Sequence, residues 1–218
     1  MDESVDPFWK TKEKALEYNE FAKKVFSGIY PLIAEQMLER TKITQGKCLD
    51  IGCGPASLSI AVAKQSDLQI SSLDISPEMY EIALANIRDE CLSDRIMPVT
   101  GDVHNIPFDD LTFDLVISRG SYHFWDDFSL AIMEICRVLR SDGKAYIGGG
   151  YGSSEIRDEV LASRKERGIV DDPVKPVRPR FKKFRQGEIE ESIESAGIKD
   201  YSIINDDTGF WMLIRKNR

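Results

Sequence analysis

Short apolar runs along the chain alternate with segments whose apolar residues recur every three or four positions. The runs predict buried strands near residues 47–51, 69–74, 96–100, 113–118 and 144–149. The helical spacing predicts helices near 10–27, 29–41, 56–65, 77–91, 127–139 and 187–196. Because the predicted strands and helices alternate along the chain, we expect an α/β protein built on a parallel sheet. Segments 199–206 and 209–215 predict a final strand pair joined by a turn.

The most informative segment is residues 48–56, CLDIGCGPA, in which an apolar strand carries one carboxylate and breaks into a glycine turn before a helix. Gly52 and Gly54 let the backbone turn sharply and approach a ligand, because a Cβ at either place would obstruct it. The free N–H groups at the start of the following helix point toward the same place. The segment predicts a nucleotide-sized binding site.

Neighbouring spacings narrow the choice of nucleotide. A dinucleotide fingerprint would place a third glycine at position 57, where this chain has Ser57. Asp74 ends the second predicted strand, twenty residues after Gly54, where it can accept hydrogen bonds from ribose hydroxyls. Asp102 and Val103 come after the third strand and offer a carboxylate for an exocyclic amine and an N–H for a ring nitrogen. Asp50 within the turn favours a cationic ligand over a phosphate.

The carboxyl ends of parallel strands share one edge of a sheet, which is where open α/β proteins bind ligands. Gly52, Asp74, Asp102 and Ser118 all stand at such ends in the predicted order. We therefore expect these four positions to converge on one site.

Five motifs in order give the chain a wider resemblance: LDIGCG (49–54), LDISPEM (73–79), GDVHNIPF (101–108), FDLVIS (113–118) and the helix-to-strand turn in 134–143. Over about residues 15–150 the chain resembles a class I S-adenosylmethionine-dependent methyltransferase of the type 11 kind. One departure is Ala56, where the family usually has glycine. The resemblance implies a Rossmann-like, doubly wound sheet of seven strands, mostly parallel with an antiparallel terminal hairpin strand. It also implies S-adenosylmethionine as cofactor and S-adenosylhomocysteine as product.

The same resemblance implies roles for particular residues. Asp50 would organise the glycine turn and the methionine amino group, Asp74 would hold the ribose, and Asp102 with Val103 would read the adenine. Ile75 and Met79 would flank the adenine ring, although a methionine on a helix face is often simple packing. Tyr18 could close over the methionine carboxylate as a lid. The full predicted cofactor set is Tyr18, Asp50, Gly52, Gly54, Asp74, Ile75, Met79, Asp102, Val103, Ser118 and Arg119.

The acceptor is predicted to lie near residues 118–126, SRGSYHFWD, after the fourth strand. This stretch lacks the Asn or Asp followed by Pro-Pro-Tyr that is common in methylation of amide or nucleobase nitrogen, which favours a small-molecule acceptor. His123 is the candidate general base, because an ordinary histidine pKa near ~6.5 suits proton removal at neutral pH. A packed, hydrogen-bonded wall residue is the alternative interpretation of His123. His104 is expected to be structural or exposed.

Length and composition agree with one soluble domain: 218 residues, 42% hydrophobic, can bury a single core. We divide it into an N-terminal helical lid (1–45), a cofactor-binding core (46–150), a basic insertion (151–186) and a C-terminal helix and hairpin (187–218). The charged first fifteen residues resemble no signal peptide or membrane anchor, so we expect a cytoplasmic protein. The four cysteines form no Cys-x-x-Cys pair, which favours free thiols and no metal site.

The formal net charge of −8 argues against a protein that coats nucleic acid or an anionic membrane. Residues 164–185, however, hold nine Lys or Arg against three acidic residues. With Pro173, Pro176 and Pro179 they predict an irregular arm over the acceptor site. The hypothesis is that this arm recruits an anionic acceptor; a solvated loop is the alternative. A non-catalytic cofactor-binding protein, an RNA methyltransferase and a nicotinamide-dependent oxidoreductase remain open as other functions.

Overall fold

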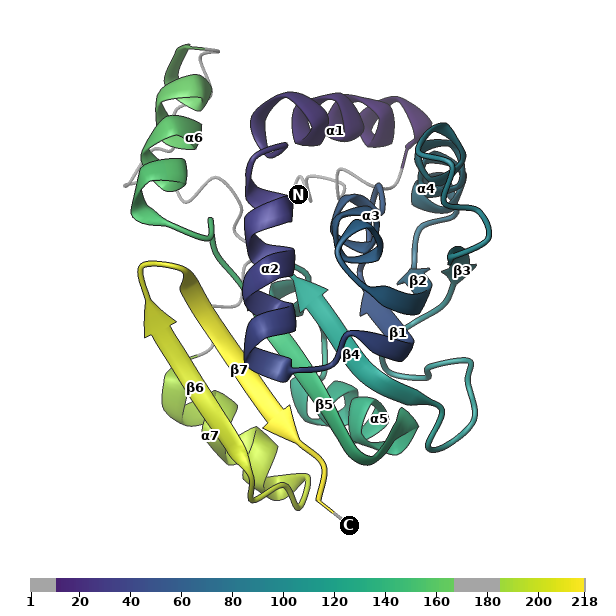
Figure 1. The fold of residues 1–218 in the computed structure, drawn as a ribbon. Helices are drawn as coiled ribbons and strands as arrows, with labels where there is room; N and C mark the ends of the chain where they lie inside the picture. The colour runs from purple at the N-terminus through teal and green to yellow at the C-terminus, as the bar shows by residue number, and fades with distance from the viewer. Residues whose placement is uncertain (1–10, 167–184, 218) are drawn as a thin grey trace, which may run out of the picture.

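The computed structural model describes residues 11–166 and 185–217, and its centre is one sheet of seven strands (Figure 1). The order across the sheet is β3-β2-β1-β4-β5-β7-β6. Strands β1 to β5 pair in parallel, and β7 runs antiparallel to both β5 and β6. This confirms the predicted fold class. The strands are β1 (Gln45–Ile51), β2 (Asp67–Asp74), β3 (Ile96–Thr100), β4 (Phe113–Arg119), β5 (Leu139–Gly149), β6 (Tyr201–Asp206) and β7 (Gly209–Arg215).

Helices cover both faces of the sheet, and each face has its own hydrophobic cluster. Helices α2 (Ile29–Thr41), α3 (Ser57–Lys64) and α4 (Pro77–Asp89) pack on one face. Helices α5 (Phe128–Val138) and α7 (Gln186–Ser195) pack on the other. Apolar side chains that alternate along each strand supply both clusters, as a doubly covered sheet requires. The sheet thus presents the carboxyl ends of the neighbouring strands β1 and β4 at one edge.

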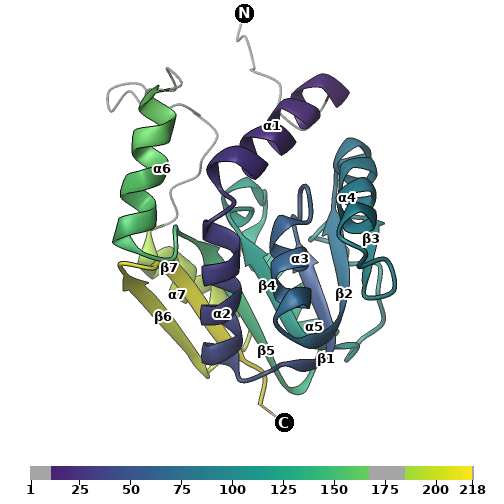
Figure 2. The ribbon, with the colours of Figure 1, turned by 45° about the horizontal axis from the view of Figure 1, so that its top comes forward.

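Helix α1 (Lys12–Val25) lies across the ends of α2, α3 and α4, over the carboxyl ends of the parallel strands (Figures 1 and 2). Its buried Ala15 packs with Met79 and Ile82 of α4. Helix α1 therefore lies over the edge of the sheet at which the sequence predicts the cofactor site.

Two predictions from the sequence need correction. The predicted irregular arm, residues 164–185, begins within a regular helix, because α6 (Ser154–Glu166) contains its first three residues; no helix was predicted there. The Ser153 hydroxyl accepts a hydrogen bond from the N–H of Ile156 at its start, 3.2 Å away, and the buried Val160 anchors it to the core. The rest of the basic segment, residues 167–184, lies outside the described residues.

The second correction concerns β5, which begins at Leu139 rather than near residue 144. Leu139 pairs with Phe113, whereas Lys144 pairs with Leu115, so the intervening residues bulge out of register. Asp142 takes a left-handed conformation there, with φ of +64°. The turn signal at 141–143 is therefore used for a bulge within a strand, not for a loop that precedes it.

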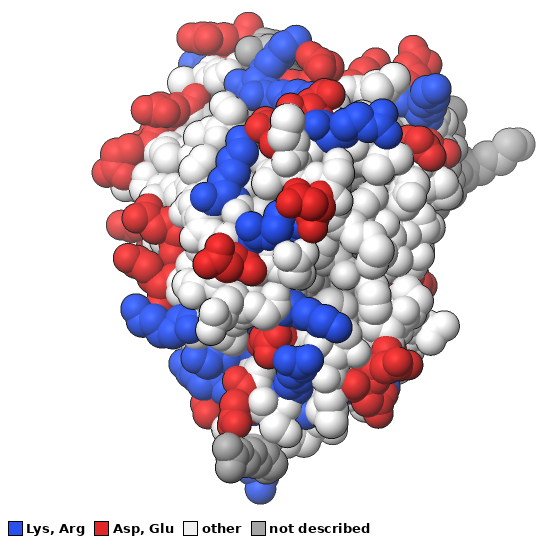
Figure 3. All heavy atoms as spheres, turned by 45° about the vertical axis from the view of Figure 1, so that its right-hand side comes forward, with Lys and Arg blue, Asp and Glu red and all other residues white. Residues whose placement is uncertain are grey.

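The surface carries mixed charge. On the face in Figure 3, basic and acidic side chains are interspersed and neither sign forms a continuous patch. Within the described part of the chain, no helix is long and apolar enough to cross a membrane. The four cysteines are free thiols. The described residues contain no cluster of three or more His, Cys, Asp or Glu side chains arranged to hold a metal ion.

Candidate functional site

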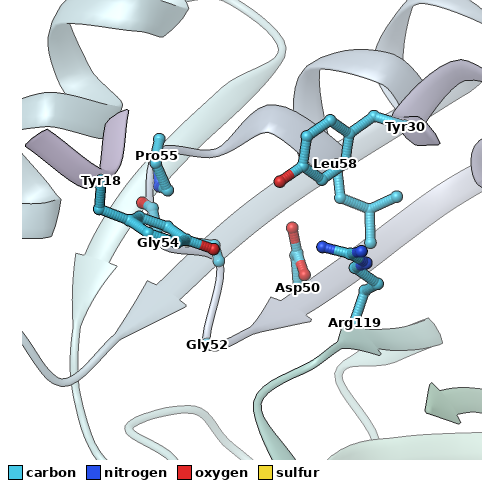
Figure 4. Close-up of a pocket in the computed structure, with 9 residues that line it drawn as sticks. Tyr18, Tyr30, Asp50, Gly52, Gly54, Pro55, Leu58 and Arg119 are labelled. Atoms are coloured by element: carbon cyan, nitrogen blue, oxygen red, sulfur yellow. The ribbon is translucent and has the colours of Figure 1, made fainter. Parts of the chain in front are cut away.

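A pocket opens at the carboxyl ends of β1 and β4, beneath α1 and α2 (Figure 4). Five residues predicted from the sequence line it together: Tyr18, Asp50, Gly52, Gly54 and Arg119. Four further lining residues were not predicted, namely Tyr30, Cys53, Pro55 and Leu58.

The glycine turn has the tight geometry expected of a site that holds a ligand close to the backbone. The N–H groups of Gly52 and Cys53 both donate to the Leu73 carbonyl, at 2.8 and 3.0 Å. Gly52 and Gly54 have φ of +66° and +52°, a region that side-chain-bearing residues rarely adopt. A Cβ on Gly52 would overlap the Ser121 side chain. Ala56, the departure from the family pattern, also has a left-handed φ, of +62°.

Asp50 is almost completely buried at the end of β1, with 1% of its surface exposed. Its Oδ2 accepts a hydrogen bond of 2.6 Å from the Ser59 hydroxyl, which is in turn 2.7 Å from the Ser72 hydroxyl. The Asp50 pKa is raised to about 7, chiefly by burial; the Ser59 hydrogen bond opposes the shift, and the nearby Asp74 carboxylate adds to it. A cationic group placed beside Asp50 would relieve this cost of ionisation.

Arg119 brings a positive charge to the same pocket from the end of β4. Its guanidinium lies 5.0 Å from the ring centre of Phe26 and 5.5 Å from that of Tyr30, so two aromatic faces hold it by cation–π contacts. Nη2 donates to the Gly150 carbonyl at 3.0 Å. The buried Nε has no hydrogen-bond partner, and Arg119 forms no ion pair with any described residue. The guanidinium is thus held in place, and its buried Nε is an unsatisfied donor.

Two tyrosines from the N-terminal helices close the pocket. Tyr18 on α1 lies beside Gly54, and the Tyr30 hydroxyl on α2 points toward Asp50 (Figure 4). Burial raises the pKa of Tyr30 far above its usual value, so its hydroxyl stays protonated at neutral pH. The sequence did not indicate Tyr30 as a site residue, because it belongs to the apolar stripe of its helix and resembles an ordinary core residue. Its hydroxyl was the one signal that could have indicated another role.

Asp74 and Ile75 lie next to the turn rather than in the pocket. The Asp74 carboxylate accepts from the N–H of Gly54 at 2.8 Å and of Ser76 at 3.0 Å, which fixes its orientation. Burial raises its pKa, and the hydrogen bonds from Ser76 and Gly54 oppose that shift. Ile75 comes next in the chain with 57% of its surface exposed, an apolar surface at the edge of the site. Both placements suit the predicted ribose and adenine contacts, which stay predictions.

The remaining predicted cofactor residues differ in how open they are. Asp102 is 47% exposed at its side chain, on the loop whose Gly101 N–H donates to the Asp74 carbonyl at 2.9 Å. Val103 is buried against the α5 face of the sheet. Met79 is also buried, packed with Ala15 under Tyr18 instead of lining the pocket. Met79 thus packs in a hydrophobic cluster, which was the alternative interpretation of this methionine.

Ser118 lies near the end of β4, and His123 lies in the turn beyond it. The buried Ser118 hydroxyl donates to the Ile51 carbonyl at 2.9 Å and lies 2.6 Å from the Ser121 hydroxyl, so it ties β4 to β1. His123 is half-buried in the 3-10 turn η1 (Tyr122–Phe124), and its ring centre is 3.8 Å from that of Tyr122. The His104 ring is held by hydrogen bonds with the Asp102 carboxylate and the Asp127 backbone N–H, as a structural role would require.

Comparisons with known proteins identify the family to which the chain belongs. A family model described as a methyltransferase domain matches residues 49–147, which run from Leu49 in β1 through the glycine turn to Ile147 in β5. A solved structure from Methanococcus maripaludis, assigned as an S-adenosyl-L-methionine-dependent methyltransferase, is 45% identical and superimposes with a TM-score of 0.88. That similarity covers 100% of this chain and 98% of the other.

Curated relatives match a shorter part of the chain. The demethylmenaquinone methyltransferase of Lactobacillus johnsonii is 32% identical over 116 residues, 52% of this chain and 48% of the relative. The malonyl-[acyl-carrier protein] O-methyltransferase of Erwinia billingiae is 32% identical over 131 residues, 60% of this chain and 47% of the relative. The chain thus spans about half the length of these relatives. It belongs to the S-adenosylmethionine-dependent methyltransferases, and S-adenosylmethionine is its cofactor.

Proposed function

We propose that this protein transfers the methyl group of S-adenosylmethionine to a small-molecule acceptor. The observation that carries the proposal is the meeting of Asp50 and Arg119 in one pocket without an ion pair between them. A carboxylate and a guanidinium that face the same space are complementary to a zwitterion, and the methionine end of the cofactor is one. Asp50 would accept from its amino group, and the Arg119 guanidinium would donate to its carboxylate.

The bound cofactor supplies an activated methyl group on a sulfonium, whose departure leaves a neutral thioether. The protein's own contribution is placement: well-oriented reacting groups can lower a barrier by up to ~7–11 kcal/mol. Asp50, Arg119 and the glycine turn would hold one end of the cofactor, and Asp74 and Asp102 the other. Tyr18 and Tyr30 would exclude water from the methionine end.

His123 is proposed as the base that takes the acceptor's proton, with a packed wall residue as the alternative. The two roles differ in one measurement. Replacement His123→Gln should lower kcat and remove a limb from the pH profile if His123 accepts a proton. If it only packs against Tyr122, the shape of the pH profile should stay the same.

Calorimetric titration with S-adenosylhomocysteine tests the cofactor site. Wild type should bind, and Arg119→Met should weaken binding by ~10-fold or more, the size of one lost hydrogen bond between charged groups. Arg88→Met, on the exposed side of α4, is the matched control and should bind as wild type does. Equal affinity in all three proteins, or absence of binding by folded wild type, would refute the proposal. NADH should give no heat, in contrast to an oxidoreductase.

Release of S-adenosylhomocysteine during a screen of methyl acceptors would separate an enzyme from a non-catalytic binding protein. An anionic acceptor is the finer part of the proposal, and it is supported only by the composition of residues 164–185. Joint neutralisation of Arg178, Arg180, Lys182 and Lys183 tests it. The acceptor KM should rise while cofactor affinity stays constant, and an unchanged KM would remove the idea of recruitment.

A further inference from the structure

The loop after β3 contains a histidine that contacts a predicted adenine-reading residue on one side and the start of a helix on the other. Asp102 Oδ1 accepts two hydrogen bonds from His104, one from its backbone N–H at 2.9 Å and one from Nδ1 at 2.7 Å. Among the described residues, Oδ2 of Asp102 has no hydrogen-bond partner. One carboxylate oxygen is therefore held within the protein, and the other is left for a ligand.

The far side of the His104 ring is anchored at the start of α5. The N–H of Asp127 donates to His104 Nε2 at 3.1 Å. Because an amide N–H can only donate, Nε2 must be the acceptor, and the ring proton must lie on Nδ1, facing Asp102. Asp127 is itself fixed as the N-cap of α5, since its carboxylate accepts from the N–H of Leu130 at 2.9 Å. Only 19% of the His104 side chain is exposed.

We propose that His104 is a positioning residue that orients Asp102 for the exocyclic amine of adenine. The inference rests on the proposed function, because it takes S-adenosylmethionine as the ligand. The terminal torsion of an aspartate is soft, and a half-exposed carboxylate can rotate widely. Two hydrogen bonds from a histidine that is anchored by Asp127 hold one oxygen, so the other oxygen is aimed before the ligand arrives. Orientation in advance lowers the entropic cost of binding.

The test compares two probes that differ at one group of the base. S-adenosylhomocysteine carries the amine, whereas its 6-deamino analogue, built on purine riboside, carries a hydrogen in its place. The analogue keeps the ring nitrogen as an acceptor but cannot donate to Asp102. Calorimetry gives the dissociation constant of each. Wild type should prefer S-adenosylhomocysteine by ~10-fold or more, as a hydrogen bond to a charged acceptor implies.

Three replacements separate the two contacts of the ring. His104→Ala removes both contacts, and His104→Gln keeps an acceptor near the Asp127 amide but removes the donor next to Asp102. His104→Asn keeps a donor next to Asp102. The preference should fall by at least ~3-fold in His104→Ala and His104→Gln and remain higher in His104→Asn. Asn105→Ala, exposed on the same loop, should keep the wild-type preference.

Each alternative result is decisive. Equal preference in wild type, His104→Ala and His104→Gln would overturn the positioning role while leaving the proposed function intact. Wild type that binds both probes equally would show that Asp102 does not read the amine, with the same consequence. Wild type that binds neither probe would overturn the inference together with the proposed function. A parallel loss of affinity for both probes in the variants, at constant preference, would mark His104 as merely structural.

Discussion

Asp50 shows how a single side chain can favour ligand binding and oppose folding. Its pKa rises from 3.8 to about 7 because burial disfavours the carboxylate. An unfolded chain releases this proton near pH 4 and the folded chain near pH 7. Between those values the folded state holds more protons, so the free energy of unfolding decreases as pH rises. The chain therefore retains a destabilising group at the position where a cationic ligand would be bound.

Replacement of Asp50 by Asn should remove this pH dependence. The stability of the variant relative to wild type should rise between pH 4 and pH 7, by a few kcal/mol at most, since each pKa unit corresponds to about 1.4 kcal/mol. Urea unfolding at pH 4, 6 and 8 without ligand measures it. Asp67→Asn, at an exposed position, is the control and should show no such trend. A difference that stays constant with pH would contradict the expected burial of the carboxylate.

Gly52 is needed for its conformation and for the space that it leaves. A Cβ there would overlap Ser121, and φ of +66° is unfavourable for any other residue. We expect Gly52→Ala to destabilise the protein by about 1–3 kcal/mol and to weaken cofactor binding. Gly28→Ala is the matched control, because its φ is −75° and nothing lies within 4 Å of the added Cβ. Equal denaturation midpoints for the two variants would show that the turn tolerates a side chain.

Among the secondary-structure elements, α5 holds the loop between β3 and β4 through Arg137. The Arg137 guanidinium donates to both oxygens of Glu134, at 2.7 and 2.8 Å, and to Asp110 at 2.8 Å. It also donates to the carbonyls of Ile106 and Phe108, both at 2.9 Å. Through these bonds the helix fixes the path of the segment that leads from Asp102 to β4.

Arg137→Leu should destabilise the fold by about 2–3 kcal/mol, because it leaves several charged or carbonyl acceptors without their donor. Arg140→Leu is the comparison. Arg140 is 47% exposed and pairs with Asp114, and exposed pairs contribute ~1 kcal/mol or less. Chemical unfolding of both variants measures the difference. Similar losses in the two would mean that the Arg137 network is no stronger than a surface ion pair.

The element boundaries were largely predictable, and the exceptions have physical causes. The turn at Ser76 and Pro77 starts α4 as expected, with the Ser76 hydroxyl accepting from the Met79 N–H at 3.2 Å. Such caps are local and can be recognised from neighbouring residues alone. Helix α6 was missed because Val160 is its one buried residue, so its apolar spacing is weak. The early start of β5 depends on pairing with β4 and β7, which no local signal reveals.

For the molecule as a whole, the cofactor should stabilise the fold by mass action. At 100 times its dissociation constant, S-adenosylhomocysteine should add about 2.7 kcal/mol. For a domain of this size that corresponds to a rise in Tm of about 5–11 °C. Differential scanning fluorimetry measures the shift, and Arg119→Met at the same ligand concentration should show less of it. A Tm that does not respond to the ligand in wild type would contradict cofactor binding by the intact fold.

The amino-acid sequence alone specifies the class of fold, the glycine turn and the carboxylates at the strand ends. Those features depend on residues close together in the chain and on the rule that parallel strands end at one edge of the sheet. Packing in three dimensions was needed to show that Tyr30 and Phe26 hold Arg119, that Ser118 joins two strands, and that His104 lies between Asp102 and Asp127. Each of these contacts joins separate elements. Their partners are set by helix packing and strand pairing, and not by local sequence.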